Sequence, residues 1–288
     1  MATLEAELAG LAGLDALELS VPPRRSRASR IWAAIWPKLG AIAIALLAWQ
    51  IVVWSGWKPE YVLPDPVKVF QTLFDNIGDY FSAAVVTLQR AVIGFGGAVI
   101  IGTFIGALVT NSRILRSAVG SMVTGLMTMP SIAWFPAAIV LFGLNESAIL
   151  FVIVIGAAPS VANGFIAGVD NTPPILLRAS RMLGAKGWSE FRHVTLPAAL
   201  PTYFSGLKQG WAFAWRSLLA GELLVQIAGK GSLGRELDSA RQFADYPGLY
   251  ATMIVILVIG IVVDSLIFGK IDRRIRRRYG LVDAAAND

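Results

Sequence analysis

The sequence contains no cysteine and a single histidine, His193. The absence of cysteine excludes disulfide bonds, thiolate metal sites and cysteine nucleophiles. One histidine cannot build a multi-histidine metal site. Charged residues are also scarce, at 15% of 288 residues, whereas hydrophobic residues make up 56%. A typical soluble domain has about 25% charged residues, so this composition predicts a membrane protein.

The hydrophobic residues gather in runs close to the ~20 residues that cross the hydrocarbon core of a bilayer. The runs are 39–54, 91–109, 118–142, 147–169, 200–227 and 249–268. They predict an all-α integral membrane protein with about six transmembrane helices in a domain of residues 31–280. Residues 1–30 form a polar extension, either a short amphipathic helix or a disordered tail, which lacks the pattern of a signal peptide. Residues 281–288 form a C-terminal tail.

The net charge of +6 comes from basic residues at the ends of the hydrophobic runs. This placement favours membrane topology over nucleic-acid binding, because cytoplasmic loops carry an excess of Lys and Arg. The basic residues cluster before the first run, between the second and third, within 170–198 and after the last run. Both termini and the 170–198 loop are therefore predicted to be cytoplasmic.

The 170–198 loop is polar and basic although it separates two hydrophobic runs. Gly184 and Gly187 interrupt its helical pattern, which predicts a helix, a glycine turn and a second helix outside the bilayer. An exposed loop of this kind favours a soluble partner. The candidate docking residues are Arg178, Ala179, Ser180, Gly184, Ala185, Lys186 and Gly187.

This loop resembles the cytoplasmic EAA loop of ABC importer permeases. The resemblance depends on the small residues Ala179 and Ser180, Gly184, Val194 ten residues later, and Leu196-Pro197. The leading Glu of the family is Arg178 in this sequence. The resemblance implies a coupling helix that docks into a groove of the ATP-binding subunit.

Two of the runs carry patterns that indicate close packing or a break. Gly94, Ala98, Gly102 and Gly106 repeat every four residues and predict a close helix–helix contact. The third run contains Pro130 and Pro136, which are predicted to kink the helix. The kink, with Met129 and Trp134 beside it, suits a translocation pathway or gate; a static kink is the alternative.

The fifth run is the polar one, with Trp211, Trp215, Arg216 and Glu222. Ionisable groups inside a membrane usually face a bundle interior or water. Arg216 and Glu222 are about 240° apart on a helix, so they cannot neutralise each other, and each needs a partner elsewhere or a wet cavity. Arg216 with the two tryptophans predicts a site that attracts an anion, while a structural Arg paired with another helix is the alternative. Asp264 is expected near a helix–helix contact.

Further motifs resemble one branch of these permeases, the importers of aliphatic sulfonates, taurine, nitrate or bicarbonate. The matching segments are 61–66, 128–136 and 214–223. The resemblance implies a type I fold, a permease homodimer, two ATP-binding subunits and a substrate-binding protein. It also implies a multi-pass protein in the bacterial inner membrane, in contact with lipid, that binds no nucleic acid. A small anion is the expected substrate, with a sulfonate favoured.

The chain itself is expected to be no enzyme and to bind no cofactor, with ATP and Mg on the partner subunits. The stretch around Gly229-Lys230 is not a Walker A motif, because Leu224 stands where that motif needs glycine. Two rival interpretations stay open. A stand-alone, ion-driven transporter would often show inverted repeats, and no clear repeat is visible. A purely structural membrane subunit would have little need for the charged fifth run.

Overall fold

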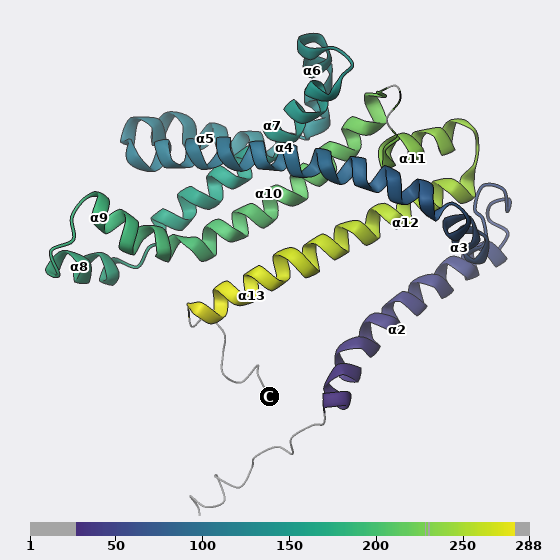
Figure 1. The fold of residues 1–288 in the computed structure, drawn as a ribbon, viewed down its shortest axis with the longest axis horizontal. Coiled ribbons are helices and arrows are strands. Elements are labelled where there is room, and N and C mark those ends of the chain that lie inside the picture. Colours follow the sequence, from purple (N-terminus) through teal and green to yellow (C-terminus); the bar gives the residue numbers. More distant parts are fainter. Residues whose placement is uncertain (1–26, 228, 230, 280–288) are drawn as a thin grey trace, which may run out of the picture. The chain divides into compact units, whose positions relative to one another are not determined.

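The structure is a computed structural model that describes residues 27–227, 229 and 231–279 (Figure 1). Every regular element in these ranges is helical. The chain divides into two compact units, one reaching Ser55 and the other starting at Gly56. Most of the predicted polar extension and the whole 281–288 tail lie outside the described residues.

The first unit contains α2 (Arg27–Trp54), a helix of 28 residues with Pro37 inside it. Its segment Ile35–Trp54 is long and apolar enough to cross a membrane. The predicted run at 39–54 lies within this segment. The helix therefore extends the predicted span toward the N-terminus through residues that are more polar.

The second unit contains the other long helices. By length and composition, α4 (Ile77–Asn111), α7 (Glu146–Asp170) and the continuous stretch Tyr246–Arg278 could also cross a membrane. That last stretch consists of α12 (Tyr246–Val262), the π-helical η3 (Val263–Phe268) and α13 (Gly269–Arg278). With α2 these are four candidate spans, or five if a bent helix pair counts as one. The 29-residue α10 (Leu196–Leu224) covers the predicted fifth run up to Leu224 but is not among these candidate spans.

The predicted third span is broken rather than kinked. The helix α5 (Arg113–Thr128) ends before Pro130, and the 3₁₀ turn η1 (Ser131–Trp134) leads into α6 (Phe135–Phe142). The two halves are bent by 105°. A residue that precedes proline is disfavoured in the helical region, and Met129 is extended, with φ −78° and ψ 126°. Pro136 does not kink a helix, because it lies in the first turn of α6, where proline is tolerated.

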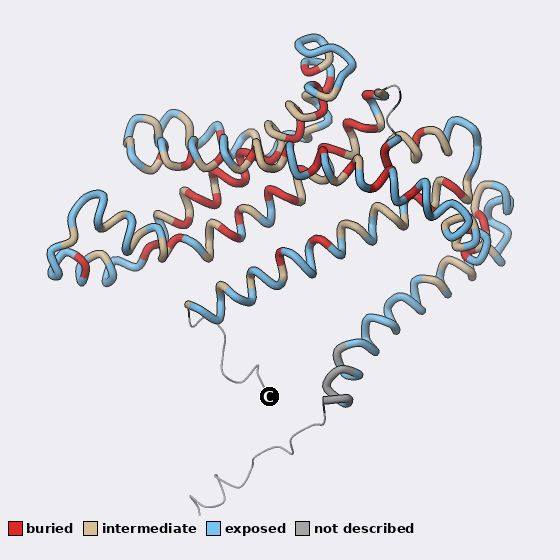
Figure 2. The backbone as a smooth tube through the Cα atoms, in the orientation of Figure 1, coloured by how far each residue is buried: buried red, intermediate tan, exposed pale blue. Residues whose placement is uncertain are grey.

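The core of this unit is the packing of α7 against α4 and α10. Figure 2 shows buried residues concentrated on α7 and α10. The predicted stripe on α4 is confirmed as the contact with α7, because all four of its residues are buried. A Cβ added to Gly102 would come within 2.5 Å of the Ala158 carbonyl oxygen. Only glycine allows the two helix backbones to approach so closely.

A second close contact joins α7 to α10. A Cβ added to Gly164 would lie 2.5 Å from the Cα of Gly206, and the reverse distance is also 2.5 Å. The two glycines therefore face each other where the helices cross. Ser160, one turn before Gly164, donates a hydrogen bond of 3.4 Å to the Gly206 carbonyl oxygen.

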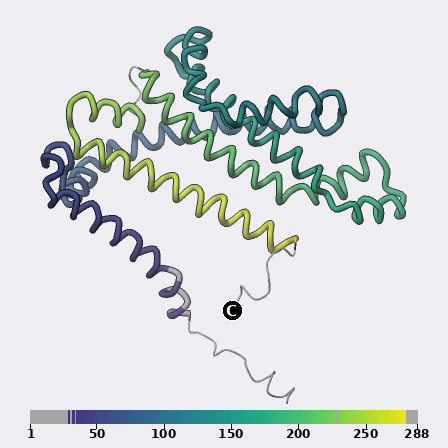
Figure 3. The backbone as a smooth tube through the Cα atoms, turned by 180° about the vertical axis from the view of Figure 1, so that it is seen from behind, coloured from purple at the N-terminus to yellow at the C-terminus, as the bar shows by residue number. Residues whose placement is uncertain are grey.

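Short helices lie at the two ends of this unit. The helix α3 (Pro66–Asp75) begins after Asp65, whose Oδ1 accepts from the Val67 N–H at 3.2 Å. The helix α3 lies at the same end as α11 (Leu233–Gln242), while α8 (Pro174–Met182) and α9 (Trp188–Glu190) lie at the opposite end (Figures 1 and 3). The start of α5 and the end of α13 lie toward the α8–α9 end. Three of the basic segments thus share one side, as the charge pattern predicts.

Candidate functional site

The α8–α9 loop has the predicted architecture of a helix, a glycine turn and a helix. Gly184 has φ +86° and Gly187 has φ +56°, values that residues with a side chain rarely adopt. After α9 the chain passes through the π-helical η2 (Phe191–Thr195) directly into α10. The second helix of the loop is therefore continuous with a long helix of the bundle.

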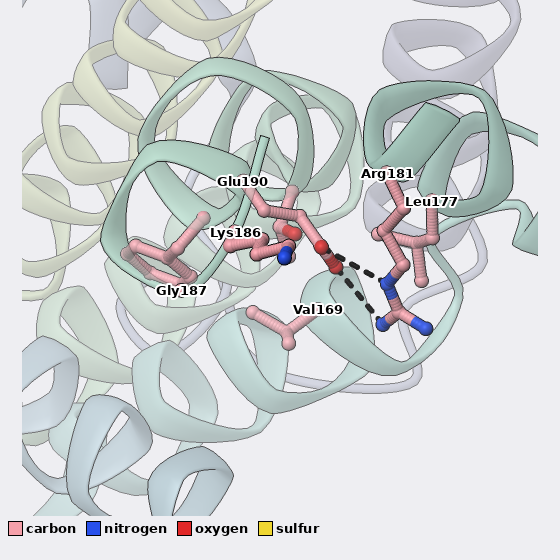
Figure 4. A pocket seen from close by; sticks show the side chains of 8 residues that line it. Val169, Leu177, Arg181, Lys186, Gly187 and Glu190 are labelled. Carbon is pink, nitrogen blue, oxygen red and sulfur yellow. Dashed lines mark hydrogen bonds and ion pairs between the residues drawn. The ribbon is translucent and has the colours of Figure 1, made fainter. Parts of the chain in front are cut away.

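An ion pair braces the two arms of this loop. The Nε and Nη2 atoms of Arg181 donate to the two carboxylate oxygens of Glu190, at 3.0 and 3.1 Å (Figure 4). These hydrogen bonds hold the pKa of the Glu190 carboxyl below its usual value. The sequence did not single out this pair, because contact across a nine-residue separation depends on how the glycine turn folds back.

Beside the ion pair lies a cavity of about 600 Å³. Its lining includes Lys186 and Gly187 from the predicted docking set, with the side chains arranged as in Figure 4. Val169 from the end of α7 and Leu177 from α8 line another part. The lining of the cavity therefore comes from both the loop and the end of a long helix of the bundle.

Most of the predicted docking residues lie on the surface of the loop. Arg178, Ala179, Gly184, Lys186 and Gly187 are exposed and Ala185 is half-buried. Ser180 is buried, and its hydroxyl donates to the Leu177 carbonyl oxygen at 3.0 Å, so its role is internal.

Large apolar side chains are also exposed on this loop. Met182, Leu183 and Trp188 have exposed fractions of 83%, 89% and 71%. Trp188 stacks on Phe191 with ring centroids 5.5 Å apart, which fixes the orientation of its indole. An apolar surface rimmed by polar residues is typical of a site where another protein binds. Sequence reasoning had emphasised small and basic residues and missed these.

Two aromatic residues of the predicted pathway stack on α10, whereas Trp134 lies on η1. Trp211 and Trp215 are stacked at 6.2 Å, and Trp211 also contacts Phe95 of α4 at 5.4 Å, edge to face. Arg216 is exposed, and its guanidinium lies 5.5 Å from the centre of the Phe213 ring. The structure therefore separates the residues: Trp211 belongs to the core, and Arg216 faces outward.

Trp215 and Arg216 line a cavity of about 630 Å³ between α10, α11 and the α12–η3 stretch. Most of the remaining lining is apolar, for example Met253 and Leu257. Asp264 also lines it and pairs with Lys208 at 3.1 Å, which confirms the expected helix–helix contact. Arg216 makes no ion pair with any residue that the structure describes, so its charge is available to a ligand in this cavity.

Glu222 lies in a different environment, a buried cluster where α4, α10 and α11 meet. Arg90 donates to Glu222 Oε1 at 2.9 Å. Thr87 Oγ1 and the Gly234 N–H both donate to Glu222 Oε2 at 3.0 Å. The Leu233 N–H donates to Thr87 Oγ1 at 3.0 Å, so the first two N–H groups of α11 both have hydrogen-bond acceptors in this cluster. Glu222 therefore pairs with Arg90 and not with Arg216, and its carboxylate is buried inside the protein.

The broken third span approaches α10 beside Arg216. Ser217 donates from Oγ to Ser131 Oγ at 2.8 Å, immediately after the break. Met129 and Pro130 are exposed, and Trp134 is half-buried against the core. The break thus contacts α10 at the residue that follows Arg216, through two serines that were not among the predicted site residues.

Comparisons with known proteins agree with this arrangement. Residues 98–277 match the family described as binding-protein-dependent transport system inner membrane component. A probable ABC transporter permease protein of Brucella melitensis is 31% identical over 241 residues, covering 82% of this chain and 94% of its own. A putative aliphatic sulfonates transport permease protein of Bacillus subtilis is 28% identical, covering 92% and 94%.

Among solved structures, an amino acid ABC transporter matches with a TM-score of 0.57 at 22% identity, over 73% of this chain and 98% of its own. That likeness shows the fold. The helical bundle and its protruding loop define a permease subunit, the non-enzymatic membrane component of an ABC importer. The chain belongs to the family of binding-protein-dependent transport system inner membrane components. This membership favours the permease over the stand-alone carrier, and ATP is hydrolysed by separate subunits.

Proposed function

We propose that this permease forms the translocation pathway for a small anion, with an aliphatic sulfonate such as taurine favoured and nitrate or bicarbonate next. Relatives bearing the names of sulfonate, nitrate and taurine permeases support this substrate class. The observation that carries the proposal is Arg216, a cation without a carboxylate partner among the described residues, at a largely apolar cavity.

The assembly that we propose contains two copies of this permease, two ATP-binding subunits that hold ATP and Mg, and one substrate-binding protein. The α8–α9 loop docks on the ATP-binding subunit, and its movement passes through η2 into α10. Both termini and this loop face the cytoplasm. The bend at Pro130 and the exposed Arg216 then belong to the region where access alternates.

Replacing Arg216 by alanine is expected to lower transport roughly tenfold to a hundredfold. A hydrogen bond to a charged group contributes about 1.5–3 kcal/mol, and each 1.4 kcal/mol is a factor of ten. The measurement is ATP-driven uptake of taurine, ethanesulfonate, nitrate and bicarbonate into vesicles that contain the whole transporter. Arg216→Lys keeps the charge and should retain more activity. Unchanged uptake in Arg216→Ala would remove the support for an anion site at this position.

Docking of the ATP-binding subunit is expected to depend on the exposed apolar surface of the loop. Leu183→Glu places a charge where an apolar contact forms, and Gly184→Trp adds a bulky side chain at φ +86°. Both variants should lose most of the ATP-binding subunit that co-purifies with the tagged protein from native membranes. Leu183→Met, which stays apolar, is the matched control. Full retention of the ATP-binding subunit in both variants would contradict docking at this loop.

A further inference from the structure

The last helix carries a row of cations that transport of a substrate does not explain. On α13, basic residues recur at the spacing i, i+3, i+4 and i+7, which places them on one side of the helix. All of them are exposed. Together they line a shallow pocket of about 370 Å³. We call this set the basic face: Lys270, Arg273, Arg274 and Arg277.

The basic face has no acidic partner among the residues that the structure describes. Asp272, the only acidic residue of α13, pairs with Arg276 at 2.9 Å, and Arg276 does not line the pocket. No residue of the basic face forms an ion pair with the described part of the chain. Arg273 uses its Nε for the Gly269 carbonyl oxygen at 3.1 Å, which leaves the rest of its guanidinium open. The pocket is therefore a concentrated positive charge without an internal counter-charge.

Helix stability does not account for this arrangement. Lys270 and Arg274 are four residues apart, as are Arg273 and Arg277, and like charges at this spacing repel. The helix dipole favours cations in the last turn only, so it cannot explain Lys270 or Arg273. Ile275 on another side of α13 packs against the core, which holds the helix in place. The repulsion is relieved when an anion occupies the pocket.

The position of α13 at the end of the stretch Tyr246–Arg278 indicates what kind of anion would occupy the pocket. The continuous stretch Tyr246–Arg278 has 33 residues, and about 20 residues cross the hydrocarbon core. Counted from Tyr246, the hydrocarbon ends near Leu266, which is exposed together with Ile267. Lys270 lies about 6 Å further along at 1.5 Å per residue, within the headgroup layer. The exposed apolar residues match the acyl chains of a lipid, and the cations that follow them match an anionic headgroup.

We propose that the basic face of α13 binds the headgroup of an anionic membrane lipid. The phosphate accepts hydrogen bonds from the arginines, and the acyl chains lie along the exposed apolar residues just before α13. Clusters of Lys and Arg directly after a transmembrane helix attract anionic lipids in this way. The inference does not depend on which anion the permease transports.

The test measures lipid binding to the purified transporter in neutral detergent by native mass spectrometry. Phosphatidylglycerol is the anionic probe, phosphatidylcholine the neutral one, and inorganic phosphate the competitor. The double variant Arg273→Gln/Arg277→Gln removes two charges from the basic face. Arg276→Gln/Arg278→Gln removes two charges from the same helix outside the pocket and is the matched control.

We expect wild type to bind phosphatidylglycerol in preference to phosphatidylcholine, without competition from millimolar inorganic phosphate. The basic-face variant should bind phosphatidylglycerol about 30-fold more weakly, from ~1 kcal/mol per basic residue. The control variant should stay within a few-fold of wild type. Equal losses in both variants, no preference for the anionic lipid, or competition by inorganic phosphate would each overturn the proposal. Loss of the co-purified ATP-binding subunit with unchanged lipid binding would assign the basic face to a protein partner instead.

Discussion

Replacing Glu222 by alanine is expected to lower the free energy of unfolding by about 3 kcal/mol, the low end for breaking a buried ion pair, because Arg90 then keeps only its longer contact of 3.4 Å with Glu146. The Glu222 side chain is fully buried and that of Arg90 is 7% exposed. The same change frees the hydrogen-bond donors of Thr87 and Gly234. The start of α11 should detach first, since Glu222 and Thr87 accept its N–H groups.

The measurement is thermal unfolding of the detergent-solubilised protein, with proteolysis around α11 as a local readout. The control is the double variant Arg90→Met/Glu222→Leu, which removes both charges at similar volume. Replacing a buried ion pair by apolar residues is often neutral or stabilising, so the double variant should be more stable than Glu222→Ala. If both are destabilised equally, the ion pair is not the source of the effect.

The buried cluster also shows where sequence reasoning stops. The polar fifth run predicted that Glu222 needs either a partner other than Arg216 or a wet cavity, and the structure shows a partner. The identity of the partner was not predictable, because Arg90 lies 132 positions away and the sequence offers many cations. Pairing of distant residues depends on the helix arrangement, which hydrophobic patterning does not determine.

Local rules worked where one residue determines its own conformation. Gly184 and Gly187 predicted the turn, because a positive φ favours glycine. Pro130 predicted an interruption, but the 105° bend depends on how α6 packs against α7. The small residues of α4 predicted a close contact, since a regular four-residue repeat is visible in one helix. Small residues also repeat every four positions around Gly164 on α7 and Gly206 on α10, and sequence reasoning missed these two repeats.

The choice of candidate residues for docking and for substrate contact depends on which side chains are exposed, and the sequence does not provide this. The resemblance identified the loop, yet exposed apolar residues such as Leu183 and Trp188 became candidates only in the structure. Similarly, Arg216 and Trp211 were grouped in sequence, and the structure places one outside and one in the core. Five residues cover one and a half turns of a helix, so two neighbours in sequence can serve opposite faces.

Replacing Gly206 by leucine is expected to disrupt the crossing of α7 and α10, with a loss of at least about 3 kcal/mol of stability, at the upper end for overpacking. A Cβ at this position would lie 2.5 Å from Gly164 Cα and 3.1 Å from the Ser160 carbonyl oxygen. Both are backbone atoms, so no side-chain rotation relieves the clash. The helices must separate, and the dispersion contacts along the crossing are lost with them.

The size of the added side chain separates this mechanism from a general effect of removing glycine. Gly206→Ala should be intermediate, because it adds only the clashing Cβ. Gly96→Leu is the matched control, since a Cβ at Gly96 meets nothing within 4 Å. The readout is the fraction of monodisperse, protease-resistant protein after purification. We expect Gly96→Leu to resemble wild type and Gly206→Leu to lose most of the folded fraction. Equal behaviour of the two leucine variants would mean that α7 and α10 tolerate separation, and transmission of loop movement through α10 into the bundle would then need another contact.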